Sequence, residues 1–329
     1  MDVPPLDSPC SWIHLPHSHV TWRSGNPPTK MLPMSVAMGI FDGVHLGHQA
    51  VLASALKHAK ENRGIAAVLT FTPHPSRILR PDQPTEMLFP EQAKERRLFQ
   101  AGMEAIIWKY FTLDFAQLQA EDFTEVLVKA FPSLASLHVG ENFRFGQMRA
   151  GTPAVLRERL AMQNVTVEAV PRFEWNDEAV SSTRLRRTIS NGRIEEANTM
   201  LGMPYRCSSQ IARGRQLGST IGFPTFNLPY VPEAKPRLGV YAVRVSGENG
   251  ERLPAVANYG LRPTVEDAAS APLLEVHLLG DVPSWAEGDT LTVEWLSFIR
   301  PEQRFDGLEA LKAQITQDVV KARELLTDG

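Results

Sequence analysis

The chain of 329 residues contains only two cysteines, Cys10 and Cys207, which lie far apart in the sequence. A disulfide framework or a zinc cluster needs more cysteines at closer spacing, so neither is expected, and this usage is typical of a reducing cytosol. The chain also lacks a basic start followed by an apolar stretch, and no later segment is long and apolar enough to span a bilayer. We therefore expect a cytoplasmic protein without a signal peptide or a membrane segment.

An excess of charge of one sign is also missing. The chain has 34 Lys and Arg against 37 Asp and Glu, a formal net charge of −3, which gives no general attraction to nucleic acid or to an anionic membrane. Any phosphate-binding surface must therefore be local. With 43% hydrophobic and 22% charged residues, the chain is expected to be a soluble globular protein, and its length predicts two domains.

The first half alternates short apolar runs with runs of helical spacing. This alternation predicts an α/β domain with a parallel sheet that is covered by helices on both faces. The ligand site of such a sheet lies at the carboxyl ends of the strands, where "GIFDGVH", "FTPHP" and "VGENFRFG" would meet. Strands are predicted within 34–41, 65–71, 103–110, 136–140 and 165–170, and helices within 47–64, 91–102, 120–131 and 152–164.

The pattern changes after about residue 186. Residues 181–205 indicate two short helices broken at "SNG", and short strand-like runs separated by Gly, Pro, Asp and Asn follow. This spacing predicts a small antiparallel β-barrel with an amphipathic helix over 307–326 at its C-terminal end. We therefore predict a first domain of residues 1–186 and a second of 187–329. The barrel strands are expected within 239–245, 253–260, 273–279 and 289–300.

The stretch "MGIFDGVHLGH", residues 38–48, combines glycines and two histidines at the end of an apolar strand. A helix that begins there presents free backbone N–H groups and the positive end of its dipole, which together form an anion site. His45 and His48 lie one turn apart, so both rings can reach the same phosphate oxygens and donate to a phosphoryl group that gains charge. The glycines, which let a phosphate approach the backbone, are Gly39, Gly43 and Gly47.

Other interpretations of this stretch are weaker. An isolated H-x-x-H usually marks two surface histidines, and a zinc site would need further ligands, but the flanking glycines and Phe-Asp-Gly favour a nucleotide site. "GRQLGST", residues 214–220, has no lysine before Ser219, so it is not a P-loop. No G-x-G-x-x-G follows a strand, which disfavours a nicotinamide dehydrogenase.

Four segments in order, "GIFDGVHLGHQ", "TFTPHP", "VGENFRFG" and "SSTRLR", closely resemble the adenylyltransferase module of prokaryotic FAD synthetases. The second half resembles the riboflavin kinase module that is fused to it, through "GFPTFN", "GVYAVRV", "ANYGLRPT", "LEVHLL" and "FIRPEQRFDGLEALKAQITQDVVKAR". The resemblance implies a Rossmann-like nucleotidyltransferase of the HxGH type followed by a kinase barrel. It implies that one module phosphorylates riboflavin to FMN with ATP and the other adenylylates FMN to FAD, with Mg²⁺ accompanying ATP.

In the first module the resemblance implies an attack of an FMN phosphate oxygen on the α-phosphorus of ATP. His45, His48 and Arg184 would stabilise the transferring group, because imidazole and guanidinium groups donate to paired phosphate oxygens. His74, Pro75 and Asn142 would lie on the flavin side. The ATP contacts implied here are Gly39, Phe41, Asp42, Gly43, Gly47, Ser181, Ser182 and Thr183.

In the second module, Thr225 and Asn227 alternate along an expected strand, so their side chains face the same way. Their oxygens are hard ligands suited to Mg²⁺, and Gly222 and Pro224 would contact ATP by the same resemblance. Glu275 lies in an otherwise apolar strand, where burial would raise its pKa and make it a better base toward the ribityl hydroxyl. An outward-facing glutamate is the alternative, and the resemblance favours the base.

The second module departs from the family pattern at three places. Ser219 stands where an arginine is usual, Ser209 where a glycine is usual, and "GDVPSWAEGD" lacks the usual Leu-Tyr-Gly. Two other interpretations therefore stay open. In one, the chain is an FMN adenylyltransferase whose barrel binds flavin without catalysis; in the other, it is a nucleotide-binding regulator without turnover. For the bifunctional enzyme that the resemblance implies, we expect a monomer or weak homo-oligomer with riboflavin, FMN, FAD and ATP as its substrates and products.

Overall fold

The computed structural model describes residues 12–213, 222–261 and 272–327. The chain divides into two compact units, Met1–Ser181 and Ser182–Gly329. Each unit has its own sheet and its own hydrophobic core. The predicted boundary near residue 186 lies within the first helix of the second unit, α7 (Ser182–Ser190), and its exact place stays a prediction.

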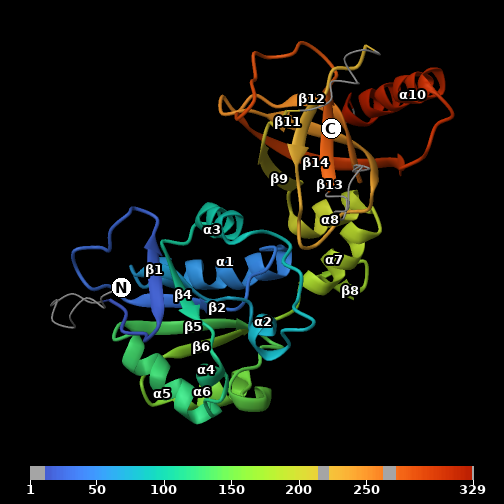
Figure 1. Cartoon of the computed structure of the whole chain (residues 1–329). Coiled ribbons are helices and arrows are strands. Elements are labelled where there is room, and N and C mark those ends of the chain that lie inside the picture. The colour runs from blue at the N-terminus through green and yellow to red at the C-terminus, as the bar shows by residue number, and fades with distance from the viewer. Residues whose placement is uncertain (1–11, 214–221, 262–271, 328–329) are drawn as a thin grey trace. The chain divides into compact units, whose positions relative to one another are not determined.

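The first unit is built on a six-stranded sheet in the order β1-β4-β3-β2-β5-β6 (Figure 1). All neighbouring pairs are parallel except β1 with β4. The predicted α/β class is thus confirmed. The strands are β1 (Ser18–Trp22), β2 (Met34–Met38), β3 (Ile65–Thr72), β4 (Ala105–Tyr110), β5 (Leu134–Gly140) and β6 (Thr166–Val170), with a small hairpin β7 (Glu174–Trp175) and β8 (Glu178–Ala179).

Helices cover both faces of this sheet because its strands are apolar on both sides. Val36 of β2 packs into the cluster that holds Phe123 and Leu156, whereas the next residue, Ala37, packs into the cluster that holds Leu52 and Leu98. One face is therefore covered by α5 and α6 and the other by α1 and α3 (Figure 1). The helices are α1 (Leu46–Glu61), α2 (Pro75–Leu79), α3 (Glu91–Gln100), α4 (Leu113–Ala116), α5 (Ala120–Ala130), the 3-10 turn η1 (Gln147–Arg149) and α6 (Pro153–Ala161).

One strand of this sheet was not predicted. β1 pairs antiparallel with β4 at the edge, with Val20 opposite Ile107. Its sequence, SHVTW, is short and half-exposed, so it gives neither an apolar run nor a clear alternation. An antiparallel edge strand on an otherwise parallel sheet is common in such folds, and it assigns a structural role to part of the N-terminal segment.

A polar network lies between α1 and the sheet, away from the strand ends. The Ser136 hydroxyl lies 2.9 Å from His58 Nδ1 and 2.8 Å from His138 Nε2, and the Ser54 hydroxyl lies 2.8 Å from His138 Nδ1. His138 is 1% exposed. Burial, and then the neighbouring His58, lowers the pKa of His138 to about 4. The ring is therefore neutral in the folded protein at neutral pH.

This network predicts acid sensitivity. Below pH 6.5 an unfolded chain protonates His138 while the folded chain does not, so the free energy of unfolding falls as the pH drops from 6.5 toward 4. We expect this residue alone to cost about 2 kcal/mol between pH 6.5 and 5. The free energy of unfolding, measured with urea at a series of pH values, should fall less steeply with decreasing pH for His138→Gln than for the wild type. The exposed His14, changed to Gln, is the control and should leave the slope unchanged.

The second unit is a nearly closed antiparallel barrel, as predicted, and its strands follow the order β10-β13-β12-β11-β14-β9 (Figure 1). A bridge between Ala212 and Asn227 links its two edges. The strands are β9 (Tyr205–Gln210), β10 (Phe226–Pro229), β11 (Gly239–Ser246), β12 (Leu253–Leu261), β13 (Pro272–Leu278) and β14 (Thr290–Pro301), and the helices are α7, α8 (Ile194–Leu201) and α10 (Leu308–Thr327).

Aromatic side chains fill the interior of this barrel. The Trp295 ring is fully buried and packs edge-on against Tyr241, with ring centres 4.6 Å apart. The opposite face of the sheet carries Val240 and Val256, which pack against Ala322 of α10. The barrel thus has an aromatic interior and an outer face that α10 covers in part.

Candidate active sites

The histidine turn of the first unit lies where β2 ends and α1 begins, as predicted. His45 is the N-cap of α1, with extended backbone, and its Nδ1 accepts a hydrogen bond of 3.3 Å from the backbone N–H of His48. The two imidazole rings stack with centres 3.6 Å apart and an angle of 18° between their planes. Because Nδ1 of His45 accepts, its ring proton lies on Nε2, which is left as a donor.

Both histidines are neutral at physiological pH. Burial, and then the charge of Arg97, lowers the pKa of His45 to about 4. The pKa of His48 lies well below its usual value, because of burial first and then the charges of His45, Lys94 and Arg97. A neutral imidazole still donates one N–H, so each ring can stabilise a phosphoryl group by a hydrogen bond although it carries no charge.

The local structure explains why two positions of the turn are glycine. Gly43 has φ +87°, a conformation that favours glycine. A Cβ at Gly47 would lie 3.2 Å from the His45 ring and 3.5 Å from the carbonyl oxygen of Val180. A larger residue at 47 would therefore disturb the His45 ring. Phe41 has φ +54° without being glycine, and its ring packs against His48 with centres 5.3 Å apart.

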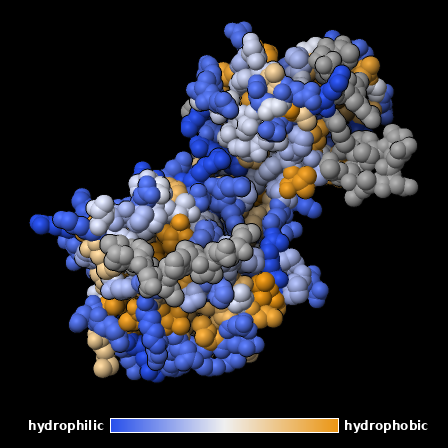
Figure 2. All heavy atoms as spheres, turned by 60° about the vertical axis from the view of Figure 1, so that its left-hand side comes forward, coloured by the Kyte–Doolittle hydropathy of each residue, from blue (hydrophilic) through white to orange (hydrophobic). Residues whose placement is uncertain are grey.

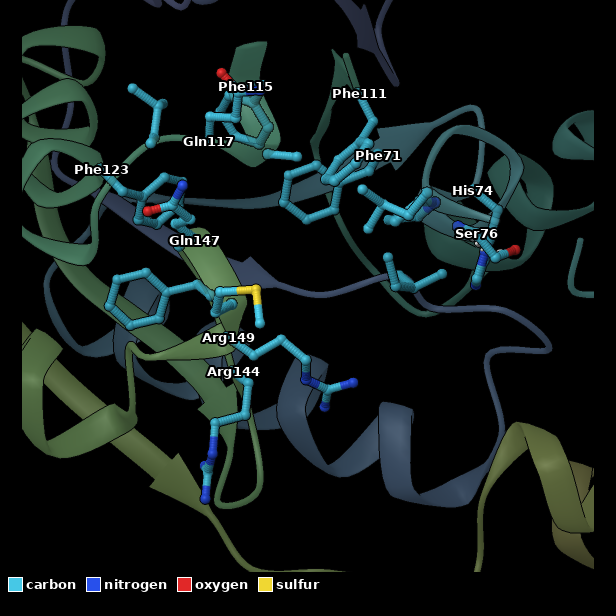
Figure 3. A pocket seen from close by; sticks show the side chains of 18 of the residues that line it. Phe71, His74, Ser76, Phe111, Phe115, Gln117, Phe123, Arg144, Gln147 and Arg149 are labelled. Carbon is cyan, nitrogen blue, oxygen red and sulfur yellow. Dashed lines mark hydrogen bonds between the residues drawn. The ribbon is translucent and has the colours of Figure 1, made fainter. Parts of the chain in front are cut away.

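A cavity of about 920 Å³ opens beside this turn, and Gly39 and Ile40 form part of its wall. Figure 3 shows aromatic rings around it, with His74 and Ser76 at one end and Phe123 and Gln147 at the other. The face of the molecule drawn in Figure 2 is largely hydrophilic with scattered hydrophobic groups. Three exposed apolar residues that line the cavity are Leu79, Leu113 and Met148, and its aromatic residues are Phe71, Phe111, Phe115, Phe123, Phe143 and Phe145.

The residues predicted on the flavin side all line this cavity. His74 caps α2, and its Nδ1 accepts from the backbone N–H of Ser76 at 3.1 Å. Pro75 is the first residue of α2, and the exposed Asn142 lies on the wall that follows β5. The cavity size and its flat aromatic walls suit a large planar ring system.

The predicted ATP contacts are distributed differently. Asp42 is 2% exposed, and its carboxylate accepts from the backbone N–H of Leu88 at 3.0 Å, which anchors the turn. Val180 lies beside Gly47, so the chain that leads to Ser181 passes the histidine turn within the first unit. Ser182, Thr183 and Arg184 begin α7 and belong to the second unit, so their role in ATP binding stays a prediction.

Two cations behind the histidine turn were missed in the sequence. Lys94 and Arg97 lie on the inner side of α3, with 3% and 8% of their surfaces exposed. Arg97 donates to the carbonyl of Val44 at 3.3 Å. The sequence contained a signal for Lys94. It lies four residues before Leu98 and so on the same face of the helix, which places a lysine on the face expected to pack against the core.

In the second unit, a row of polar side chains crosses three strands. Glu275 of β13 lies directly opposite Asn227 of β10 and Asn258 of β12. Directly opposite residues in antiparallel strands have Cβ atoms about 5 Å apart, so the three side chains are neighbours on one face. Asn258 lies opposite Val240, which packs against α10, so this is the outer face of the barrel.

Two details of this row differ from the sequence interpretation. Glu275 is half-buried and not buried as expected, because it faces outward from the aromatic interior. Thr225 lies one residue before β10, so it does not alternate with Asn227 within the strand. Pro224 accepts at its carbonyl from the ring of His277 at 2.9 Å, which ties this loop to β13. Gly222 has φ +90°, and Ser219 lies outside the described residues.

A second carboxylate beside this row was not singled out in the sequence. The carboxylate of Glu302 lies against Gly260, two residues after Asn258, so closely that a Cβ at position 260 would collide with it. The pKa of Glu302 is raised by burial first and then by the charge of Glu275, while a hydrogen bond to Asn258 opposes the shift. Ser209, the other departure from the family pattern, donates to the carbonyl of Pro229 at 2.6 Å and so links the two barrel edges.

The donors of this row fit Mg²⁺ bound together with a nucleotide. The amide oxygen of Asn227 and the hydroxyl of Thr225, two residues before it, are hard oxygen donors, and Mg²⁺ usually combines one or two protein ligands with phosphate oxygens and water. Within the described ranges, no group of three or more His, Cys, Asp or Glu side chains forms a dedicated metal cage. Over the same residues, no helix is both long and apolar enough to cross a membrane.

Comparisons with known proteins find a different family in each half of the chain. Residues 28–184 match the FAD synthetase family and residues 201–326 match the riboflavin kinase family. The bifunctional riboflavin kinase/FMN adenylyltransferase of Escherichia coli K12 is 36% identical over 289 residues, which cover 88% of this chain and 91% of that protein. The Bacillus subtilis protein of the same name is 33% identical, over 94% of this chain and 96% of its own length.

A solved structure shares the fold over most of the chain. The crystal structure of a protein described as a macrolide-efflux protein from Streptococcus pneumoniae superposes with a TM-score of 0.81 at 29% identity. The match covers 90% of this chain and 95% of that one. Both units thus occur together in another chain.

Proposed function

The chain belongs to the family of bifunctional riboflavin kinases/FMN adenylyltransferases, and from this premise we propose which residues carry each of its two reactions. The second unit phosphorylates riboflavin with ATP to give FMN and ADP. The first unit joins FMN to the adenylyl group of ATP to give FAD and pyrophosphate. The observation that carries the first assignment is the stacked, neutral histidine pair beside an aromatic cavity.

In adenylyl transfer, a phosphate oxygen of FMN attacks the α-phosphorus of ATP and pyrophosphate leaves. The cavity holds the flavin ring, and the histidine turn receives the reacting phosphates at the N-terminus of α1. Nε2–H of His45 donates to the α-phosphate oxygens as charge develops on them. An FMN phosphate needs no strong base, so positioning and charge stabilisation supply the rate. Arg184 adds a cation to the phosphates.

In the kinase reaction, the terminal ribityl hydroxyl of riboflavin attacks the γ-phosphorus of ATP. Glu275 takes the proton of this hydroxyl as the general base. Asn227 and Thr225 would hold Mg²⁺ with the ATP phosphates, and Gly222 and Pro224 would contact the nucleotide. When bound, Mg²⁺ would neutralise charge on the transferring phosphoryl group.

A product assay tests both assignments at once. Purified protein is given riboflavin with Mg-ATP in one reaction and FMN with Mg-ATP in another, and the products are separated by chromatography. We expect FMN and then FAD from the first reaction and FAD with pyrophosphate from the second. Formation of FAD from FMN but no FMN from riboflavin would instead favour a non-catalytic barrel. Binding of both ligands without pyrophosphate release would favour a regulator.

The remaining features follow from the same proposal. We propose a cytoplasmic enzyme that works as a monomer or weak homo-oligomer and has no nucleic-acid partner, in line with its net charge of −3. The division near residue 186 is proposed to separate two modules that fold by themselves, since each unit has its own core.

A further inference from the structure

Lys94 is a charged side chain buried directly behind the histidine turn. Its Nζ lies 3.3 Å from the carbonyl oxygen of Ile40, 3.3 Å from the hydroxyl of Thr70 and 4.6 Å from the centre of the Trp108 ring. The Thr70 hydroxyl itself donates to the same Ile40 carbonyl at 3.0 Å. An ammonium from α3 and a hydroxyl from β3 thus converge on one backbone oxygen.

This backbone oxygen lies where two parts of the site meet. Ile40 forms part of the cavity wall, and the next residue, Phe41, has φ +54° and packs against His48. A non-glycine residue with positive φ is strained, and it persists only where the surroundings hold it. Fixing the carbonyl of Ile40 therefore fixes both the cavity wall and the ring that supports His48.

We propose that Lys94 is a positioning residue for adenylyl transfer, which together with Thr70 holds the turn that joins the flavin cavity to the histidine pair. This inference rests on the proposed function of the first unit. Lys94 is 3% exposed and does not line the cavity, so it acts through Ile40 and not on the substrate itself.

The charge of Lys94 has a second effect. It is among the causes that keep the pKa of His48 well below its usual value. Burial lowers the pKa of Lys94 itself to about 8, opposed by nearby carboxylates, so it stays mostly protonated at pH 7. The charged and titratable groups that act on these two side chains are His45, Arg97, Glu91 and Asp42.

Two variants separate the hydrogen bonds from the charge. Lys94→Met removes both, whereas Thr70→Val removes one of the two donors to Ile40 and keeps the charge. We expect each to lower kcat for FAD formation from FMN roughly 10- to 100-fold, the size of a small misplacement of reacting groups. The rate relative to wild type is measured from pH 5 to 8, so that ionisation of FMN and ATP cancels.

The pH dependence should differ between the two variants. Without the Lys94 charge, His48 becomes protonated at higher pH, so the relative rate of Lys94→Met should vary with pH at the acid end of this range. The relative rate of Thr70→Val should not change with pH.

A matched control is available in the same sheet. Lys109 is also buried, its Nζ lies 3.5 Å from the carbonyl of His17 and 4.7 Å from the centre of the Phe115 ring, and it does not contact the turn. Lys109→Met should show a relative rate that is flat with pH.

Wild-type kcat in both Lys94→Met and Thr70→Val would overturn the positioning role, and a flat pH profile for Lys94→Met would overturn the role of its charge. If Lys94→Met does not fold, Thr70→Val decides the positioning role. A wild-type protein that makes no FAD would contradict the proposed function itself, which the product assay detects separately.

Discussion

Replacing both His45 and His48 with alanine should lower FAD formation from FMN by about 10⁴-fold or more. Loss of one positioned donor costs about 10²–10³ in rate, and the two stacked rings lie at the same helix N-terminus. FMN formation from riboflavin should continue at the wild-type rate, because the proposed kinase residues lie on the barrel. Both rates are measured on the full chain by product chromatography.

The single variants sharpen this result. His45→Ala also removes the acceptor for the N–H of His48, whereas His45→Asn at the same position can keep a side-chain acceptor for an N-cap. We expect His45→Asn to fold as well as wild type and still to lose most of its FAD-forming activity. His14→Gln on the exposed surface is the control for histidine loss. A double variant with near-normal FAD formation would show that the histidines have no role in the reaction.

Replacing Glu275 with glutamine should abolish FMN formation while FAD formation from supplied FMN stays intact. The terminal hydroxyl of riboflavin is a weak nucleophile, and a positioned general base contributes typically 10²–10⁴-fold. Glutamine keeps the size of the side chain and its place between Asn227 and Asn258, so the barrel should fold. The same two product assays report the two activities separately in one preparation.

Further substitutions near this row distinguish a base from a metal ligand. Thr225→Ala should also slow the kinase, but excess Mg²⁺ should restore part of its rate, because a weakened ligand can be offset by mass action. Glu275→Gln should not respond to Mg²⁺. A matched control is Glu287→Gln, which changes an exposed glutamate outside the strands. Full activity of Glu275→Gln would mean that the base is another group, of which Glu302 is the nearest candidate.

The architecture was predictable because its signals are local. Strands β2 and β3 are buried along their whole length, and α1 carries a clear apolar stripe. The spacing of the apolar residues and the length of each run therefore identify these elements as strands and a helix. β1 was not predicted, because an edge strand of five half-exposed residues has no such pattern. Its place depends on its pairing with β4, which only the folded chain shows.

The site was predictable only in part. The histidines and glycines form a contiguous motif, so the sequence displayed them together. Lys94 reaches the same turn from a helix that begins more than 40 residues later, and only tertiary packing brings it there. The burial of Glu275 was overestimated for a related reason. An acid among apolar residues in a strand can face either side of a barrel, and the alternation alone does not say which side is the interior.

The two faces of the barrel have separate tasks. The interior holds Trp295 and the tyrosines that pack around it, while Asn227 and Glu275, two of the proposed kinase residues, lie on the outer face. Glu275 and Asn258 are only half-buried, so their substitution removes few core contacts, whereas Asn227 is buried. A lineage that obtains FMN from elsewhere could lose kinase activity through such changes and keep a stable barrel. Natural selection can thus alter one activity of this chain without discarding the module that carries it.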